Sequence, residues 1–353
     1  MTELKNIQGG FLSRKHLLIF GVLLVALVLL FLLDLFLGSV RIPFSEIVRI
    51  LLSGEGKEEW VTIIYKFRFP KAITALLAGV ALSVSGLQMQ TVFRNPLAGP
   101  YVLGISAGAS LGVAILMLGF SSLISASNIL NIGNWAIVSA AWIGSGVILF
   151  LILMVSMRVR DIMTILILGI MFGSATTAVV SILQYFSHET ALKAFVVWTM
   201  GSLGHVSHEQ LQVLSFSVIV GLGISFASVK LLNALLLGET YATSLGLNVK
   251  ASRILIFVST SILAGSITAF CGPIGFIGIA VPHIARMIFN TADHRILLSG
   301  TLVLGGILLL FSDIIAHVPG YGTILPINSV TALVGIPVVV WIIIRNRKYS
   351  AFS

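Results

Sequence analysis

Apolar segments long enough to cross a membrane recur along this chain, and they limit its fold more than any other property. A helix needs about 20 mostly apolar residues to span the hydrocarbon core of a bilayer. The stretch from Asn95 to Met157 contains no Lys, Arg, Asp or Glu and is too long for one span. A soluble domain is roughly 25% charged, whereas this chain is 9% charged with a mean hydropathy of +1.10. Its surface must therefore face lipid.

The pattern predicts one all-α integral membrane domain over residues 1–353 with about ten transmembrane helices. The expected spans are roughly 17–37, 70–92, 101–119, 135–156, 162–183, 208–229, 252–271, 275–290, 296–314 and 325–344. The polar segment 121–134 divides the long uncharged stretch. Pro273 breaks the run 254–285, because proline lacks an amide donor and clashes with the preceding turn. We expect the first apolar run to be an uncleaved helix rather than a signal peptide, since it is long and no small-residue cleavage site follows.

Charge placement predicts the orientation of these spans. With the N-terminus in the cytoplasm, 14 of the 21 Lys and Arg residues fall in cytoplasmic segments, as the positive-inside bias requires. Both tails, 1–16 and 345–353, are then cytoplasmic. Six of the seven outer basic residues gather before and at the start of the second span: Arg41, Arg49, Lys57, Lys66, Arg68 and Lys71.

The sequence lacks the residues that several classes of function require. The basic pI of about 9.9 follows largely from the topology, and no basic run exceeds 345–348, so no nucleic-acid partner is expected. A single cysteine, Cys271, leaves no multi-thiolate metal site. The spans hold no chain of acids for proton coupling, and Asp34, Asp313 and His317 lie near outer span ends, where polar heads can reach water. The histidines and glutamates of the loop between spans five and six lack metal-ligand spacing and are expected in a solvated loop.

Small residues repeat every four positions in the third span, at Gly104, Gly108 and Gly112. This spacing lets helix backbones approach closely. It is compatible either with a helix that lines a pathway or with tight packing alone. No G-x-x-x-x-G-K-[ST] phosphate loop occurs in the sequence. Energy for active transport would therefore have to come from another subunit.

Two long motifs carry a family resemblance. Residues 86–109 read GLQMQTVFRNPLAGPYVLGISAGA, and residues 272–286 read GPIGFIGIAVPHIAR. Together with 67–71 (FRFPK), 198–203 (WTMGSL), 238–246 (GETYATSLG) and Leu325-Pro326, they resemble the permeases of ABC importers for iron–siderophores, haem and vitamin B12. The similarity covers roughly residues 40–345 in the same order.

The resemblance implies a type II ABC importer permease fold in the bacterial cytoplasmic membrane. It implies a second permease copy, two cytoplasmic ABC ATPase subunits and an extracytoplasmic substrate-binding protein as partners. It implies no permanently bound cofactor and no catalytic residue, with ATP used by the ATPase subunits. The implied cargo is an iron complex, a ferric siderophore or haem. Vitamin B12 is the alternative, and an ATP-independent transporter or channel is a more distant one.

The resemblance implies roles for four groups of residues. The ATPase-coupling loop comprises Leu237, Gly238, Glu239, Ala242, Leu245 and Gly246. Docking of the binding protein is assigned to Arg68, Lys71 and His317, where the family usually has arginine at the latter two positions. The cytoplasmic gate is assigned to Asp161, Ile162 and Met163. Structural motif positions are Arg94, Asn95, Pro96, Gly104, Gly108, Gly272, Pro273, Pro282, His283 and Arg286. Those at 94–96 and 282–286 are expected to shape inner helix ends and to hold subunit contacts.

Overall fold

A computed structural model describes residues 13–38, 40–119, 133–159, 161–317 and 324–350. The segment 121–134 that was predicted to separate spans three and four lies almost wholly outside these ranges, as do parts of both predicted tails. Every regular element assigned within the described ranges is a helix.

Ten described helices are candidates for membrane spans, as the sequence predicts. Seven are long and apolar enough to cross: α1 (Arg14–Phe36), the continuous run Glu58–Val92 that ends in α4, α7 (Asn134–Arg158), α8 (Ile162–Phe186), α10 (His208–Ala227), α13 (Val249–Cys271) and α15 (His294–Ala316). Three apolar helices are shorter: Ile105–Gly119, which contains α5 (Ile105–Ala114) and η4 (Ile115–Gly119), α14 (Ile277–Phe289), and Ile327–Trp341 within α16 (Ile327–Ser350).

The second span begins earlier than predicted. The predicted span starts at about residue 70, but the helix runs through Pro70 from α3 (Glu58–Thr62) and η2 (Ile63–Arg68) into α4 (Phe69–Val92). The reason is a π-helical turn in η2, where the amide of Phe69 bonds to the carbonyl of Ile64, five residues back. Such a turn shifts the hydrogen-bond register and accommodates a residue that has no amide donor.

Four short helices lie outside the spans in segments where the sequence patterns indicated connections. They are α2 (Phe44–Ser53), α9 (Glu189–Thr199), α11 (Val229–Leu236) and α12 (Glu239–Ser244). The first is amphipathic, and its Ile47 and Ile50 form a small core with Ile42 and Ile64. A 3₁₀ turn, η3 (Pro100–Leu103), precedes α5.

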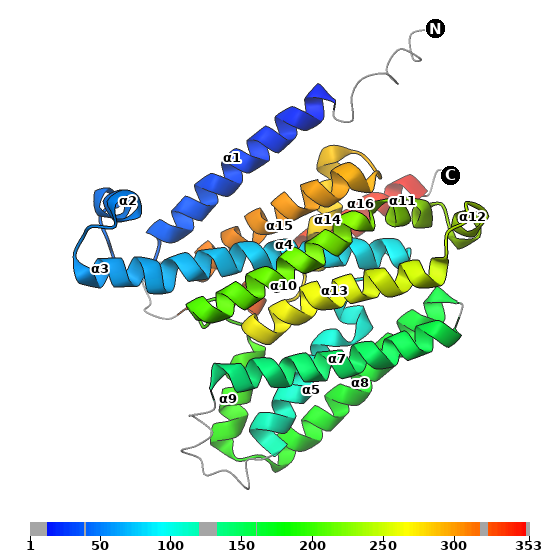
Figure 1. Ribbon diagram of the computed structural model, residues 1–353, viewed down its shortest axis with the longest axis horizontal. Coiled ribbons are helices and arrows are strands. Elements are labelled where there is room, and N and C mark those ends of the chain that lie inside the picture. Colours follow the sequence, from blue (N-terminus) through cyan, green and yellow to red (C-terminus); the bar gives the residue numbers. More distant parts are fainter. Residues whose placement is uncertain (1–12, 39, 120–132, 160, 318–323, 351–353) are drawn as a thin grey trace.

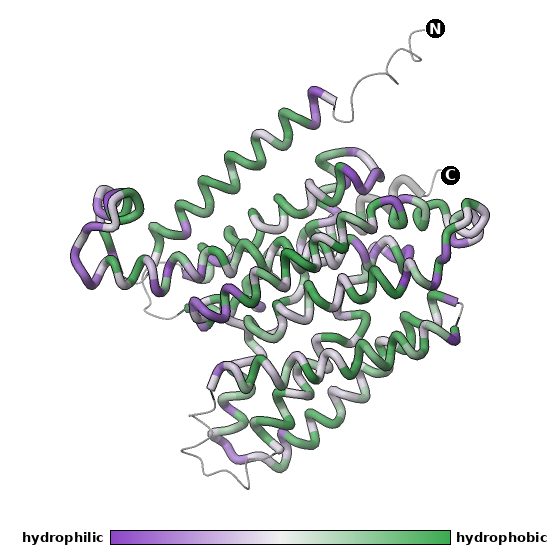
Figure 2. Tube along the Cα trace, in the orientation of Figure 1, coloured by the Kyte–Doolittle hydropathy of each residue, from purple (hydrophilic) through white to green (hydrophobic). Residues whose placement is uncertain are grey.

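The long helices run roughly parallel to one another, with two distinct ends (Figure 1). The α2, α3 and α9 helices lie at one end, and α11, α12, the start of α1 and the end of α16 lie at the other. Figure 2 shows hydrophilic residues concentrated towards these ends and apolar residues between them. The arrangement agrees with the predicted topology, in which both chain ends and the coupling loop share the cytoplasmic side.

The centre of the bundle is α4, most of which is buried against α10, α13, α14 and α15. Glycines permit its closest approaches. A Cβ added to Gly79 would collide with the backbone of Gly305 on α15, and one added to Gly86 with the backbone of Gly278 on α14. Close approach of backbones supplies much of the packing energy between membrane helices.

The small residues of the third span pack against neighbouring helices. Gly108 is buried, and a Cβ added there would lie 2.6 Å from the carbonyl oxygen of Gly144 on α7. Gly104 has φ +68° and lies beside the backbone of Gly169 on α8. The glycine face of α5 therefore packs tightly against other helices. If α5 lines a pathway, it does so with its half-buried side chains.

Candidate functional site

Three helices converge on one lysine at the outer end of the bundle. The Lys71 Nζ on α4 lies 2.8 Å from Asp313 Oδ2 on α15 and 3.3 Å from Asp34 Oδ1 on α1. The side chains of Lys71, Asp34 and Asp313 are 10%, 1% and 3% exposed. One ammonium group thus compensates two buried carboxylates and ties three spans together.

His317 completes this cluster directly after the end of α15. Its Nδ1 donates to the backbone carbonyl of Asp313 at 2.8 Å, which leaves Nε2 to accept from the Lys71 ammonium at 3.5 Å. The interaction with the Asp313 carboxylate raises the pKa of the His317 imidazole above its usual value. The histidine therefore belongs to the same polar cluster as Lys71.

Arg68 is buried one turn before Lys71. Its Nη1 donates to the carbonyls of Leu35 and Phe36 at 2.9 and 3.0 Å, and its Nη2 donates to the carbonyl of Val40. The carbonyls at a helix end have no partner within the helix. The guanidinium supplies donors to the last carbonyls of α1 and so fixes the connection from α1 to α2.

The expectation that the polar heads at the outer span ends reach water is wrong for Asp34 and Asp313, which are buried. The sequence placed these residues near helix ends, but it did not show that the ends of α1, α4 and α15 meet. Arg68 and Lys71 were likewise expected as exposed bases, and both are largely enclosed by their partners. Their assignment to docking stays a prediction.

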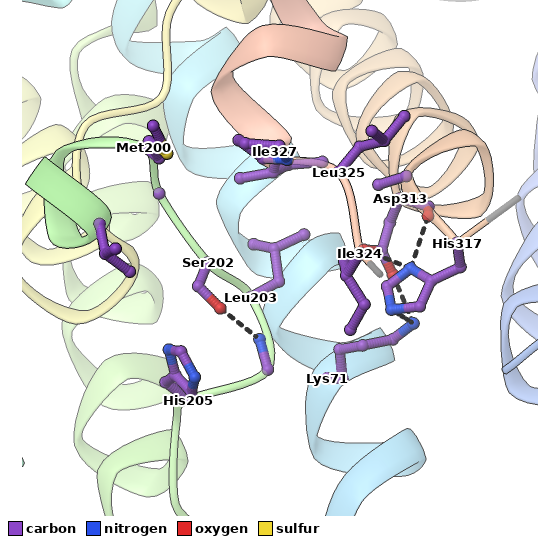
Figure 3. Close-up of a pocket in the computed structure, with 15 residues that line it drawn as sticks. Lys71, Met200, Ser202, Leu203, His205, Asp313, His317, Ile324, Leu325 and Ile327 are labelled. Atoms are coloured by element: carbon purple, nitrogen blue, oxygen red, sulfur yellow. Dashed lines mark hydrogen bonds and ion pairs between the residues drawn. The ribbon is translucent and has the colours of Figure 1, made fainter. Parts of the chain in front are cut away.

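A cavity of about 490 Å³ opens beside this cluster. Lys71, Asp313 and His317 form part of its wall, and Ser202, Leu203 and His205 lie across from them (Figure 3). Segments 200–205 and 324–327 complete the lining. Two motif segments that are far apart in sequence, 198–203 and Leu325-Pro326, thus contribute to one outer cavity.

The predicted coupling loop forms a short helix at the opposite end of the molecule. Gly238 precedes α12 with φ +103°, and Gly246 follows it with φ +82°. Ala242 is buried, whereas Leu237 and Leu245 expose most of their side chains. The helix is therefore held through Ala242, and exposed apolar side chains flank both of its ends.

Glu239, the first residue of α12, binds a buried arginine that the sequence analysis did not single out. Its Oε1 accepts from Nε of Arg253 at 3.1 Å and also from Nη2. Arg253 lies on α13 and is almost fully buried. An arginine inside the predicted span 252–271 was the signal that could have identified it, because charges within spans are rare and are usually paired.

The predicted gate residues occupy the turn that begins α8. Asp161 caps the helix by accepting from the amides of Met163 at 3.3 Å and Thr164 at 2.8 Å. The Thr164 hydroxyl also donates to Asp161 at 2.6 Å, and this hydrogen bond, followed by that from the Thr164 amide, lowers the pKa of the Asp161 carboxyl. Ile162 is half-buried and Met163 is exposed. The turn thus has a rigid polar cap beside an apolar edge.

The two long motifs meet at the inner ends of the central helices. Nε2 of His283 donates to the carbonyl of Pro96 at 2.8 Å. Arg286 donates to Gln90 on α4, and Gln90 donates to the Ile279 carbonyl on α14. Neighbouring motif positions shape the same region.

Arg94 has a left-handed backbone with φ +46°, and the Asn95 side chain accepts from the amide of Leu97. Pro282 lies buried within α14. The hydrogen bonds of His283 and Arg286 thus join α14 to the end of α4 and the segment after it. The role of the motif positions in subunit contacts stays a prediction.

Gly272 ends α13 at the outer side, immediately before Pro273. Its φ is +74°, and a Cβ there would lie 2.5 Å from the carbonyl oxygen of Trp198. The adjoining Cys271 carbonyl accepts from the amide of Ser202 at 2.8 Å. Glycine is required here because the chain turns against another backbone.

A second polar network at the inner end was also not predicted. His294 on α15 hydrogen-bonds to Thr91 on α4 and to Asn233 on α11, in both cases at 2.8 Å. Asn233 in turn donates to Asp293 at 2.7 Å. Its members are scattered over 200 residues of sequence, so no local pattern could have grouped them.

The outer histidines and glutamates of the loop between spans five and six are exposed. Within the described ranges, no three His, Cys, Asp or Glu side chains come together as metal ligands.

Comparisons with known proteins extend over nearly the whole chain. Residues 26–345 match the FecCD transport family. The chain is 36% identical to the vitamin B12 import system permease protein BtuC of Klebsiella pneumoniae, covering 98% of each protein. It is 34% identical to the hemin transport system permease protein HmuU of Yersinia pestis, covering 94% of this chain and 96% of the relative.

Among solved structures, a metal-chelate type ABC transporter in an inward-facing conformation matches with a TM-score of 0.80 and 26% identity. That match covers 93% of this chain and 99% of the other.

Proposed function

The chain belongs to the FecCD transport family, and from this premise we propose that it carries an iron complex, a ferric siderophore or haem, into the bacterial cell. It is a multi-pass permease of an ABC importer in the cytoplasmic membrane. It is a transport subunit with no catalytic step of its own, and ATP hydrolysis is assigned to a separate subunit.

The cargo proposal draws on what the similar proteins share. Their names specify vitamin B12, hemin and a metal chelate. All three are bulky molecules in which organic ligands enclose a metal ion. A metal chelate is therefore the common chemistry, and we propose the iron complexes among them, with vitamin B12 as the alternative.

The exposed face of α8 supports passage of such a molecule. Ser174, Thr177 and Ser181 are exposed along it, and each hydroxyl donates to a carbonyl of its own helix at 2.9–3.0 Å. The helix carries no charged side chain. Hydroxyl groups that are already satisfied, set among apolar residues, bind a bulky chelate weakly. Weak binding permits release on the inner side, as conduction through a pore requires.

We propose the following assembly: two permease copies, two ABC ATPase subunits and one extracytoplasmic binding protein. The apolar residues exposed on and beside α12, Leu237 and Leu245, support an ATPase contact at the cytoplasmic end. An exposed apolar patch commonly marks a protein interface. The turn at Asp161, Ile162 and Met163, on the same side, is the proposed gate.

The outer cavity is the proposed docking position for the binding protein. Lys71 and His317 lie in its wall and can meet a partner there. Arg68 would support this surface indirectly, because it donates to three carbonyls of the α1–α2 connection and so fixes its position. Charge at such a surface mainly steers and orients docking.

Transport in proteoliposomes tests the proposal. The complete complex is expected to accumulate labelled ferric siderophore or haemin only when ATP and the binding protein are both present. Cobalamin serves as the competing cargo in the same assay. Uptake of cobalamin alone would replace the iron proposal with the vitamin alternative. Flux through liposomes that contain only this chain would instead indicate an ATP-independent transporter.

Substitution of Gly238 by valine is expected to uncouple ATP hydrolysis from transport. A φ of +103° is open to glycine alone, and a valine there would incur about 1–3 kcal/mol of strain. The start of α12 would shift while the spans remain inserted. We expect uptake per ATP to fall by roughly tenfold, a change of about 1.4 kcal/mol in coupling.

Gly54→Val is the matched control for this variant, because Gly54 also has positive φ, with open space around it, but lies at the outer end. Normal uptake per ATP in Gly238→Val would contradict the coupling assignment.

A further inference from the structure

The cytoplasmic end of α13 lies between two elements with proposed roles in transport. On one side is α12, the proposed contact with the ATPase. Glu239 of α12 binds the guanidinium of Arg253 through both Nε and Nη2. Two hydrogen bonds from a guanidinium to a carboxylate fix its orientation in addition to pairing the two charges. The side chain of Arg253 is only 2% exposed and that of Glu239 is 34% exposed, so the contact is enclosed on the α13 side and reaches the surface on the α12 side.

On the other side of α13 is the connection from α7 to α8, the proposed gate. Lys250, one turn before Arg253, donates from Nζ to the carbonyl of Met157 at 3.3 Å, near the end of α7. Along its length α13 also packs against α7, the helix that leads into the gate turn. The helix α13 therefore contacts α12 at its cytoplasmic end and α7 beside it.

The remainder of α13 favours movement as a rigid unit. Most of the helix is buried, from Ser252 to Cys271. At its outer end the carbonyl of Cys271 accepts from Ser202, beside the outer cavity. A packed helix moves by shifts of the whole element rather than by continuous deformation. A displacement of α12 must then either move α13 or break the contact between Glu239 and Arg253.

We propose that Arg253 is a positioning residue that transmits displacement of α12 through α13 to α7, and so to the gate turn that follows α7. The proposal rests on the proposed function, because it takes α12 as the element that the ATPase moves. Arg253 touches neither cargo nor nucleotide in this scheme. It acts through Glu239 on one side, and the packing of α13 against α7 carries the displacement to the other side.

The test uses the complete transporter in lipid nanodiscs with a reporter at the gate. Cys271 is the only cysteine in the sequence and is buried, so a Cys271→Ala background accepts a single new thiol. Met163→Cys is placed on the exposed edge of the turn and labelled with a water-soluble maleimide. Without substitution at 239 or 253, the labelling rate is expected to change by at least about fivefold between the nucleotide-free and ATP-trapped states.

In Glu239→Gln and Arg253→Gln, this nucleotide-dependent change is expected to disappear while ATP hydrolysis continues. Uptake per ATP should fall in parallel. Arg253→Lys keeps the positive charge and should retain part of the response, whereas loss of packing alone would affect the lysine and glutamine variants alike. Glu209→Gln, which removes an exposed carboxylate at the outer end, is the matched control and should respond as the parent does.

Three outcomes would overturn the inference. One is a full labelling response with normal uptake per ATP in Glu239→Gln. Another is loss of the ATPase from purified Glu239→Gln complexes, because Glu239 would then serve the ATPase contact itself. The third is an equal loss of response in Arg253→Lys and Arg253→Gln. If Arg253→Gln does not fold, Glu239→Gln and Arg253→Lys decide the question. A parent complex with no ATP-driven uptake would refute the proposed function instead.

Discussion

Lys71→Met is expected to destabilise the protein by about 3–5 kcal/mol, the range for removing one partner of a buried ion pair. Methionine fills a similar volume but removes the only ammonium group within 4 Å of Asp34 and Asp313 in the described structure. Two carboxylates would then lie close together in an enclosed site, with the His317 imidazole beside Asp313 as their remaining cationic partner. The measurement is thermal unfolding of the detergent-purified protein, read as a fall in the melting temperature.

Additional substitutions separate charge from packing in this cluster. In the Lys71→Met background, Asp34→Asn and Asp313→Asn together should recover most of the lost stability, because no buried carboxylate is then left without its lysine. Lys193→Met removes an exposed lysine on α9 and should change stability by no more than about 0.5 kcal/mol. An unchanged melting temperature in Lys71→Met would mean that the three outer helix ends do not depend on this lysine.

Gly86→Ala is the second substitution with a large expected effect. The added methyl group would lie far inside the 3.0 Å that Cβ atoms essentially never breach, and it would meet the backbone of Gly278 rather than a flexible side chain. Helices α4 and α14 would have to separate at the centre of the bundle. Overpacking of this kind costs about 1–3 kcal/mol and more where backbone must move.

The matched control for Gly86→Ala is Gly223→Ala on α10, which has nothing within 4 Å of the added atom. Alanine should be neutral or slightly stabilising there, because it has the higher helix propensity. Both variants are compared by melting temperature and by the fraction that remains monodisperse after extraction. Equal behaviour of the two variants would contradict the close contact between α4 and α14.

Much of the fold could be predicted from local properties of the chain. The ten spans follow from hydropathy, and the orientation follows from where Lys and Arg fall. The differences between the predicted and the observed fold also concern single segments. The second span begins before its predicted start at about residue 70, because a π-helical turn in η2 accommodates the amide hydrogen bond that Pro70 cannot make. The segments of α2 and α9 were read as connections, because a short helix outside the bilayer needs no long apolar run.

The site was predicted less completely. The motif positions Arg94–Pro96 and Pro282–Arg286 were identified, but their contact through His283 and Pro96 was not. Arg253 was not singled out, although it is a charge within a predicted span. Its importance depends on Glu239, which lies in a separate element.

Hydropathy and charge placement along the chain predict about ten membrane crossings with both ends on the cytoplasmic side. Those properties depend on each segment separately, because the bilayer acts on every span through its own length, hydropathy and flanking charge. The pairing of polar residues, in contrast, depends on how the spans pack together. Lys71 meets Asp34 and Asp313, and Arg253 meets Glu239, because small residues let particular helices pack closely and so bring distant positions together. Packing involves pairs of spans, so it cannot be predicted from the hydropathy of each span alone.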